Sequence, residues 1–143
     1  MHNNRIMQWA LRIITAAGLA VDAFVHLDLA AGFDANKATI SQGTLFRVQG
    51  IAALIIAVAV LTLRRRWVYL LAFVVAASAL GAVVLYRYVD VGALGPLPNM
   101  YEPAWYAEKR YSALAEAVAA AAALLLVGNP LRRRATTGSN HAD

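Results

Sequence analysis

The chain has 143 residues, of which 61% are hydrophobic and only 15% charged, and its mean hydropathy is +0.57. Soluble domains carry about 25% charged residues, so this composition excludes an ordinary soluble domain, and its apolar content excludes a disordered chain. The formal net charge of +5 does not indicate a nucleic-acid partner, because the basic residues gather at the ends of apolar stretches and form no basic face.

Four apolar stretches are long enough to cross a bilayer, which takes about 20 mainly apolar residues. They are residues 13–33, 40–63, 67–88 and 103–127. Their length, their alanine and leucine content and their lack of period-two alternation favour helices over strands. The sequence therefore predicts an all-α membrane protein, a left-handed up-down bundle of four transmembrane helices in one domain over residues 1–130. We expect residues 131–143 to form a basic and then disordered cytoplasmic tail.

Local signals mark the ends of two of these helices. Thr39 and Gln42 have the spacing of a capping box, which predicts the start of the second helix. Pro103 suits the first position of the fourth helix, and Gly128 is a typical helix stop. In the first stretch, Asp22 and the apolar residues that continue beyond it argue against a cleaved signal peptide.

Basic residues predict the orientation in the membrane. They precede the first span at Arg5 and Arg12, join the second and third spans at 64–66, and follow the fourth at 132–134. These sites share one side of the membrane only if the number of spans is even. By the positive-inside rule, both termini are then cytoplasmic, as in a multi-pass protein of a bacterial plasma membrane.

The longer of the two expected outer connections, residues 89–102, is unusual for its composition. Gly92, Gly95, Pro96 and Pro98 alternate with apolar residues. Such a loop is expected to pack on the outer mouth of the bundle, either as simple covering or as a lid over a cavity.

Two of the predicted helices carry polar stripes through the bilayer. Arg12, Thr15, Asp22 and His26 follow helical spacing on the first, and Glu102, Trp105, Lys109, Ser112 and Glu116 on the fourth. An ionisable residue inside the membrane costs about 3 kcal/mol and usually faces protein or water. From the helical rise, Asp22 and Glu116 each lie roughly 15 Å from the cytoplasmic edge, near the midplane. If the first and fourth helices are neighbours, these two carboxylates approach each other, with His26 just above them.

This arrangement has a structural and a functional interpretation. In the structural one, Asp22 pairs with His26, and Glu116 pairs with Lys109 or Arg47, so that the polar groups only fix helix register. In the functional one, the cluster binds a ligand or a proton and consists of Asp22, His26, Arg47, Lys109, Ser112 and Glu116. Asp22, His26 and Glu116 would then be the ligands of any metal ion.

No sequence motif indicates a cofactor. A quinone or haem role is a further possibility, but one intramembrane histidine cannot supply both axial ligands, so haem would require a homodimer or a partner. The chain has no cysteine, which excludes disulfides and thiolate metal sites.

Small residues indicate where helices approach one another. Ala77 and Gly81 in the third helix, and Ala115 and Ala119 in the fourth, have the spacing of close helix contacts. Gln49, beside Gly50, predicts an interhelical hydrogen bond. Because the third helix has no ionisable group in its interior, we expect it to face lipid or another subunit, in a homo-oligomer or a larger membrane complex.

Three segments resemble a known group of proteins. They are Ala23-Phe24-Val25-His26-Leu27, then Leu45-Phe46-Arg47-Val48-Gln49-Gly50, and a tryptophan-bearing approach to a last span that contains Glu116. In these, the chain resembles small four-span membrane proteins of high-GC Gram-positive bacteria, a group without an assigned activity. The resemblance implies a fold and a membrane location and carries over no catalytic residue.

Two functions remain open from the sequence. The first is a non-enzymatic accessory or assembly subunit of a membrane complex. The alternative is a small proton- or cation-coupled transporter or ligand-binding protein that uses Asp22, His26 and Glu116. An enzyme is a weaker hypothesis, because no nucleophile has a base beside it and no cofactor fingerprint is present.

Overall fold

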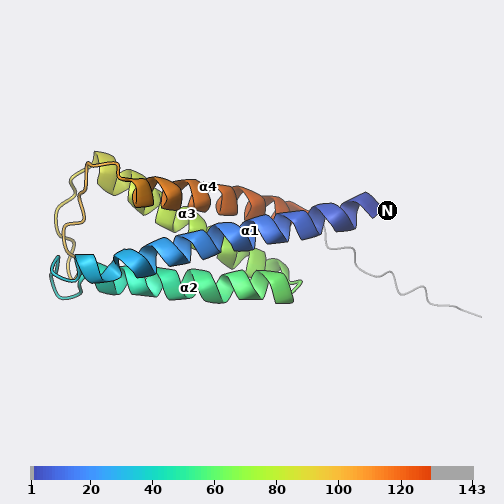
Figure 1. Cartoon of the computed structure of the whole chain (residues 1–143), viewed down its shortest axis with the longest axis horizontal. Helices are drawn as coiled ribbons and strands as arrows, with labels where there is room; N and C mark the ends of the chain where they lie inside the picture. Colours follow the sequence, from blue (N-terminus) through green and yellow to red (C-terminus); the bar gives the residue numbers. More distant parts are fainter. Residues whose placement is uncertain (1, 130–143) are drawn as a thin grey trace, which may run out of the picture.

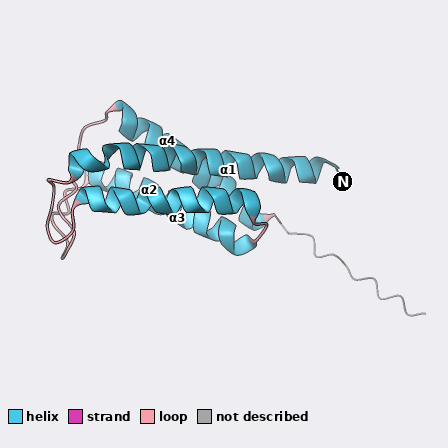
Figure 2. Ribbon diagram, turned by 60° about the horizontal axis from the view of Figure 1, so that its bottom comes forward, coloured by secondary structure: helices cyan, strands magenta, loops and turns pink. Residues whose placement is uncertain are grey.

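The computed structural model of the chain describes residues 2–129, and the predicted tail at 131–143 lies outside them. Four antiparallel helices form an up-down bundle (Figures 1 and 2). They are α1 (His2–Leu29), α2 (Gln42–Thr62), α3 (Arg66–Tyr88) and α4 (Ala107–Gly128), and the short 3-10 helix η1 (Ala30–Phe33) continues α1. All four are long and apolar enough to cross a membrane, so the predicted four-helix architecture is confirmed.

The helix starts differ from those predicted. Ser41, not Thr39, is the N-cap of α2, because its hydroxyl accepts a hydrogen bond from the backbone N–H of Thr44 at 3.0 Å. Helix α4 begins at Ala107, four residues after Pro103. The backbone N–H of Glu102 donates to the carbonyl of Tyr86 at 3.0 Å, which ties this segment to the end of α3 in an extended conformation, also compatible with proline.

Helix α1 lies at the centre of the packing. It packs against α2 and α4, and α4 packs in turn against α3. The closest approach of α1 to α4 is at Gly18, where an added Cβ would lie 2.8 Å from the carbonyl oxygen of Ala115 and 2.9 Å from the Cβ of Ala119. Gly50 of α2 faces α1 in the same way, since its Cβ would lie 2.7 Å from Cγ of Leu27. Glycine therefore allows two close helix contacts with α1.

Not all of the small residues of α3 make the close helix contacts that their spacing predicted. Ala72 and Ala76 are fully buried in the core, whereas Gly81 is exposed and an added Cβ there would meet nothing within 4 Å. Ala77 is partly buried against the core, so only Gly81 of the predicted pair lies on the side of α3 that faces away from the other helices. The core side of α3 is the Ala72–Ala76 face.

One end of the bundle carries both longer connections, residues 30–41 and 89–106, and we call it the loop end. Figure 1 shows α4 separating from α1 toward this end, and the 89–106 loop crosses from one side to the other. The loop is fastened there: Ile40 N–H donates to the carbonyl of Pro96 at 3.0 Å, and Asn36 Nδ2 donates to the carbonyl of Asn99 at 2.9 Å. As predicted, the loop packs on the end of the bundle.

Candidate functional site

The polar stripes of α1 and α4 bring three ionisable side chains together inside the bundle. Asp22, His26 and Glu116 each offer one ligand atom, and these atoms all lie within 4.8 Å of one another. Asp22 and Glu116 have no exposed surface. The i, i+4 spacing puts Asp22 and His26 on one face of α1, and the contact at Gly18, one turn away, holds that face against α4.

Neighbouring polar side chains contact both carboxylate oxygens of Asp22 and one of Glu116. Gln49 Nε2 of α2 donates to Asp22 Oδ2 at 2.8 Å. Ser112 Oγ donates to Glu116 Oε1 at 2.6 Å, and it lies 3.5 Å from Asp22 Oδ1. His26 Nδ1 lies 2.7 Å from Asp22 Oδ1 and 3.0 Å from the backbone carbonyl of Asp22. The predicted interhelical hydrogen bond of Gln49 is therefore confirmed, and its partner is Asp22.

The second oxygen of Glu116 is left over. Oε2 is buried and has no hydrogen-bond partner among the described residues. Buried polar atoms are nearly always paired, and two carboxylates in a low-dielectric interior cannot both ionise without a compensating positive charge. The cluster therefore requires a proton or a cation to compensate its negative charge.

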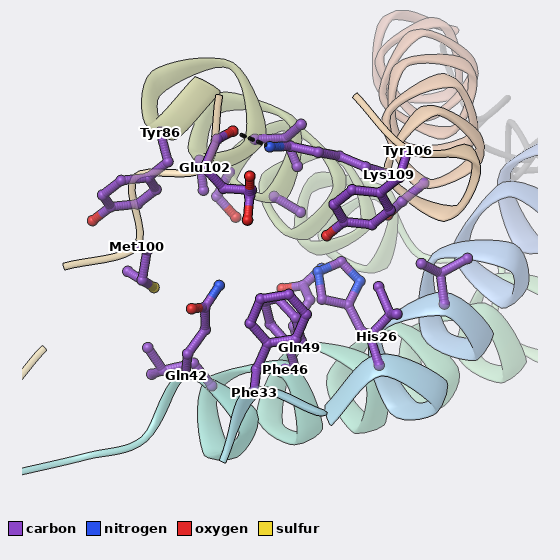
Figure 3. A pocket seen from close by; sticks show the side chains of 18 residues that line it. His26, Phe33, Gln42, Phe46, Gln49, Tyr86, Met100, Glu102, Tyr106 and Lys109 are labelled. Atoms are coloured by element: carbon purple, nitrogen blue, oxygen red, sulfur yellow. Dashed lines mark hydrogen bonds between the residues drawn. The ribbon is translucent and has the colours of Figure 1, made fainter. Parts of the chain in front are cut away.

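A cavity of about 270 Å³ lies between this cluster and the loop end. All four helices and the 89–106 loop line it, and most of its lining residues are apolar. His26, Gln49 and Ser112, which bond to the two buried carboxylates, line it together with Met100, Glu102 and Tyr106 of the loop. Figure 3 shows the labelled residues around the cavity. Residues of the 89–106 loop therefore form part of the cavity wall, and the lid interpretation stays a prediction.

The imidazole of His26 is held on both sides. Its ring packs edge-on against Phe46, with centroids 5.1 Å apart, and Phe46 packs in turn against Phe33. Because Nδ1 faces Asp22, the other ring nitrogen, Nε2, is left on the side of the cavity (Figure 3). A carboxylate that orients a histidine in this way fixes its tautomer and ring position.

Lys109 lines the same cavity but does not pair with Glu116. Its Nζ donates to the carbonyl oxygens of Glu102 at 2.5 Å and Ala104 at 3.3 Å, and it lies 5.9 Å from the ring centre of Tyr106. Burial, with smaller contributions from nearby Glu102 and Glu108, raises the pKa of Tyr106. Lys109 thus belongs to the loop side of the cavity, where backbone carbonyls stabilise its ammonium group by hydrogen bonds.

Arg47 lies away from the cluster. Both of its terminal nitrogens donate to the two carboxylate oxygens of Asp34 at 2.7 Å, and both side chains are exposed. This guanidinium holds the pKa of Asp34 below its ordinary value. The proposed pairings of Glu116 with Lys109 or Arg47 are therefore wrong, because the connections at the loop end supply both cations with nearer partners.

The remaining half of the α1 stripe has a structural role. Arg12 is buried and donates from Nε to the carbonyl of Val60 at 2.8 Å and from a terminal nitrogen to the carbonyl of Leu61. These carbonyls belong to the last turn of α2 and have no partner within the helix. Thr15 donates to the carbonyl of Leu11 at 2.8 Å.

Several residues of the site escaped the sequence argument. Phe46 and Met100, which line the cavity, are apolar residues among many, and no spacing distinguishes them. The partner of Arg12 lies 48 residues away along the chain. The one sequence signal for a cap at the end of α2 was Arg12 itself, a basic residue beside an apolar stretch.

Comparisons of the chain with protein-family models, with curated proteins and with solved structures found no match. They identify no family, and the resemblance to small four-span membrane proteins of high-GC Gram-positive bacteria stays an expectation. The function is therefore argued from the site alone.

Proposed function

We propose that this chain is a small four-span membrane protein that binds a cation between Asp22, His26 and Glu116. The cation would reach the site through the cavity from the loop end. With both termini in the cytoplasm of a bacterial cell, that end faces the outside. The proposal is the cation-coupled or ligand-binding alternative of the sequence argument.

One observation carries the proposal: Glu116 Oε2 is buried without a partner beside a second buried carboxylate. A buried charge without compensation is strongly destabilising. The hydrogen bonds from Gln49 and Ser112 satisfy one oxygen of each acid but bring no positive charge. A cation at the cluster would supply that charge, and the cavity beside His26 and Ser112 gives it a route.

The proposal is tested by ligand-dependent stability in lipid nanodiscs. A ligand that binds only the folded state at 100 times its dissociation constant stabilises it by about 2.7 kcal/mol. Thermal midpoints are measured for the wild type, Glu116→Gln and the exposed control Glu108→Gln on the same helix, with Na⁺, K⁺, Mg²⁺, Zn²⁺ and tetramethylammonium. We expect at least one cation to raise the midpoint of the wild type and of Glu108→Gln, and to raise that of Glu116→Gln much less.

The results that contradict this proposal are equally clear. They are a wild type that responds to none of these cations, or a Glu116→Gln variant that responds as strongly as the wild type.

A second candidate function is the non-enzymatic accessory or assembly subunit. The observation that favours it is the exposed Gly81 of α3, which follows the partly buried Ala77 by four residues and where an added Cβ would meet nothing within 4 Å. Small residues at this spacing allow a second helix to approach closely. Native mass spectrometry after gentle extraction tests it: a homo-oligomer or a complex that Gly81→Leu dissociates supports this function, and a monomer in every preparation contradicts it.

A further inference from the structure

We propose that the cation is a divalent transition-metal ion of the zinc type, held by Asp22 Oδ1, His26 Nδ1 and Glu116 Oε2. This inference rests on the proposed function and adds the class of the ion and the ligand atoms. It follows from which atoms of the cluster are engaged, from the charge of the cluster, and from the kind of donors present.

The first step concerns the carboxylate oxygens that would face the ion. Gln49 holds Asp22 through Oδ2, and Ser112 holds Glu116 through Oε1. Oε2 of Glu116 has no partner within residues 2–129. Oδ1 of Asp22 faces another proposed ligand, Nδ1 of His26, at 2.7 Å, and also has Ser112 Oγ at 3.5 Å. Metal-binding carboxylates commonly have one oxygen on the metal while the other accepts a hydrogen bond that orients the group. Gln49 and Ser112 are placed as such orienting residues.

The second step concerns charge. Two carboxylates and a neutral imidazole carry a charge of about −2 when both acids are ionised. A divalent ion cancels this charge in the low-dielectric interior, whereas a monovalent ion leaves one buried negative charge. Lys109 does not compete for the acids, because its Nζ is held by the carbonyls of Glu102 and Ala104.

The third step concerns the donor atoms. Sodium, potassium, magnesium and calcium ions prefer oxygen ligands, whereas imidazole suits zinc, copper, iron and nickel ions. Zinc binds nitrogen and carboxylate oxygen at about 2.0–2.2 Å. His26 Nδ1 and Asp22 Oδ1 are 2.7 Å apart, and all three ligand atoms lie within 4.8 Å of one another. The three atoms are therefore close enough together for rotation of their side chains to bring them around one ion.

Binding changes the proton on His26. In the metal-free site Nδ1 donates its proton to Asp22. To bind a metal through Nδ1, the imidazole gives up this proton and carries one on Nε2 instead, on the cavity side. Three protein ligands leave at least one coordination position for water, which is typical of zinc sites that exchange ligands and not of closed structural sites.

The test uses Co²⁺ as a spectroscopic probe for the full chain in nanodiscs, purified with a tag that lacks histidine and treated with a chelator. The other two histidines of the chain, His2 and His141, are replaced by alanine in all samples. We expect one Co²⁺ per chain with visible absorption bands, displaced by Zn²⁺ but not by Mg²⁺ or Na⁺. X-ray absorption of the Zn²⁺ form should show one imidazole nitrogen among oxygen ligands.

Variants assign the ligands. We expect His26→Ala and Glu116→Gln, which remove proposed ligands, to weaken Co²⁺ binding at least tenfold. Ser112→Ala removes only an orienting hydrogen bond and should weaken Co²⁺ binding by at most about 100-fold. The exposed Glu108→Gln should bind as the background protein does. If Glu116→Gln fails to fold, Ser112→Ala and the absorption spectrum still decide.

Two results would overturn the metal assignment: no stoichiometric Co²⁺ or Zn²⁺ binding, or binding that none of the His26, Ser112 and Glu116 substitutions weakens. If, in addition, Na⁺, K⁺ or tetramethylammonium stabilises the wild type but not Glu116→Gln, the ion class is wrong and the proposed function stands. If no cation has an effect, both fail.

Discussion

Gly18 decides how closely α1 approaches α4, and through this distance it decides how closely Asp22 approaches Glu116. The glycine lies one helical turn from Asp22, directly against the backbone of Ala115 and the side chain of Ala119. In a close-packed interior, the addition of even one methyl group forces side chains or backbone to move. The geometry of the acidic cluster therefore depends on a residue that carries no polar atom in its side chain.

We expect Gly18→Ala to lower the free energy of unfolding by about 1–3 kcal/mol, because its Cβ would overlap the carbonyl of Ala115. The matched control is Gly81→Ala, where the added Cβ meets nothing within 4 Å and the change should stay within about 0.5 kcal/mol. Denaturant unfolding of the two variants in the same detergent measures both values. Equal stability losses would contradict the close contact.

At this scale, helical spacing was sufficient to find Asp22, His26, Ser112 and Glu116, because their positions follow from the rise and period of regular helices. It was insufficient for the partners of Lys109 and Arg47. Those partners, the carbonyls of Glu102 and Ala104 and the carboxylate of Asp34, belong to irregular connections. The path of such a connection depends on long-range contacts that spacing does not contain.

Among the elements, α2 depends on α1 at its C-terminal end. The last carbonyls of a helix have no partner within it, and Arg12 supplies two donors to those of Val60 and Leu61. A buried arginine and an unsatisfied helix end thus compensate each other.

Replacement of Arg12 by methionine should lower the free energy of unfolding by about 1–3 kcal/mol, since it leaves these carbonyls without their donors. Arg5→Met, at an exposed position of the same helix, should have an effect within about 0.5 kcal/mol. Thermal or denaturant unfolding compares the two. An Arg12→Met protein as stable as Arg5→Met would show that the cap is not needed.

The start of α2 depends on an ion pair with the preceding connection. Because Arg47 lowers the pKa of Asp34 in the folded state, the pair stabilises the fold above the ordinary pKa of aspartate, and this contribution is lost as the pH falls through the lowered value. We expect Asp34→Asn to lower the thermal midpoint slightly at pH 7 and to lose this effect in strong acid. Parallel melting curves of the two proteins from pH 7 to pH 2 check it, and a constant difference would contradict the role of the pair.

The ends of the elements were harder to predict than their interiors. Long apolar stretches indicated four helices, but Thr39 and Pro103 marked helix starts that the structure places at Gln42 and Ala107. Both misplaced starts lie at the loop end, where backbone hydrogen bonds between the two connections override local preference.

In the whole molecule, the start of α1 and the end of α4 lie at the end of the bundle opposite the loop end. The positive-inside rule predicts that this end is cytoplasmic and that the loop end is outside. Cysteine introduced at Lys37, in an exposed loop-end position, should react with an impermeant thiol reagent added to intact cells. Cysteine at Arg65, in the exposed connection of α2 to α3, should react only after the cells are opened. The reverse pattern would invert the orientation.

The chain connectivity also makes the two ends of the bundle different. Helices α1 and α2 form one pair and α3 and α4 another, and the backbone joins the pairs only at residues 63–65. At the opposite end they are held together by hydrogen bonds such as those from Ile40 to Pro96 and from Asn36 to Asn99. Residues 63–65 are thus the covalent link between the two pairs, and a wider opening of the cavity at the loop end would require the hydrogen bonds between the two connections to break.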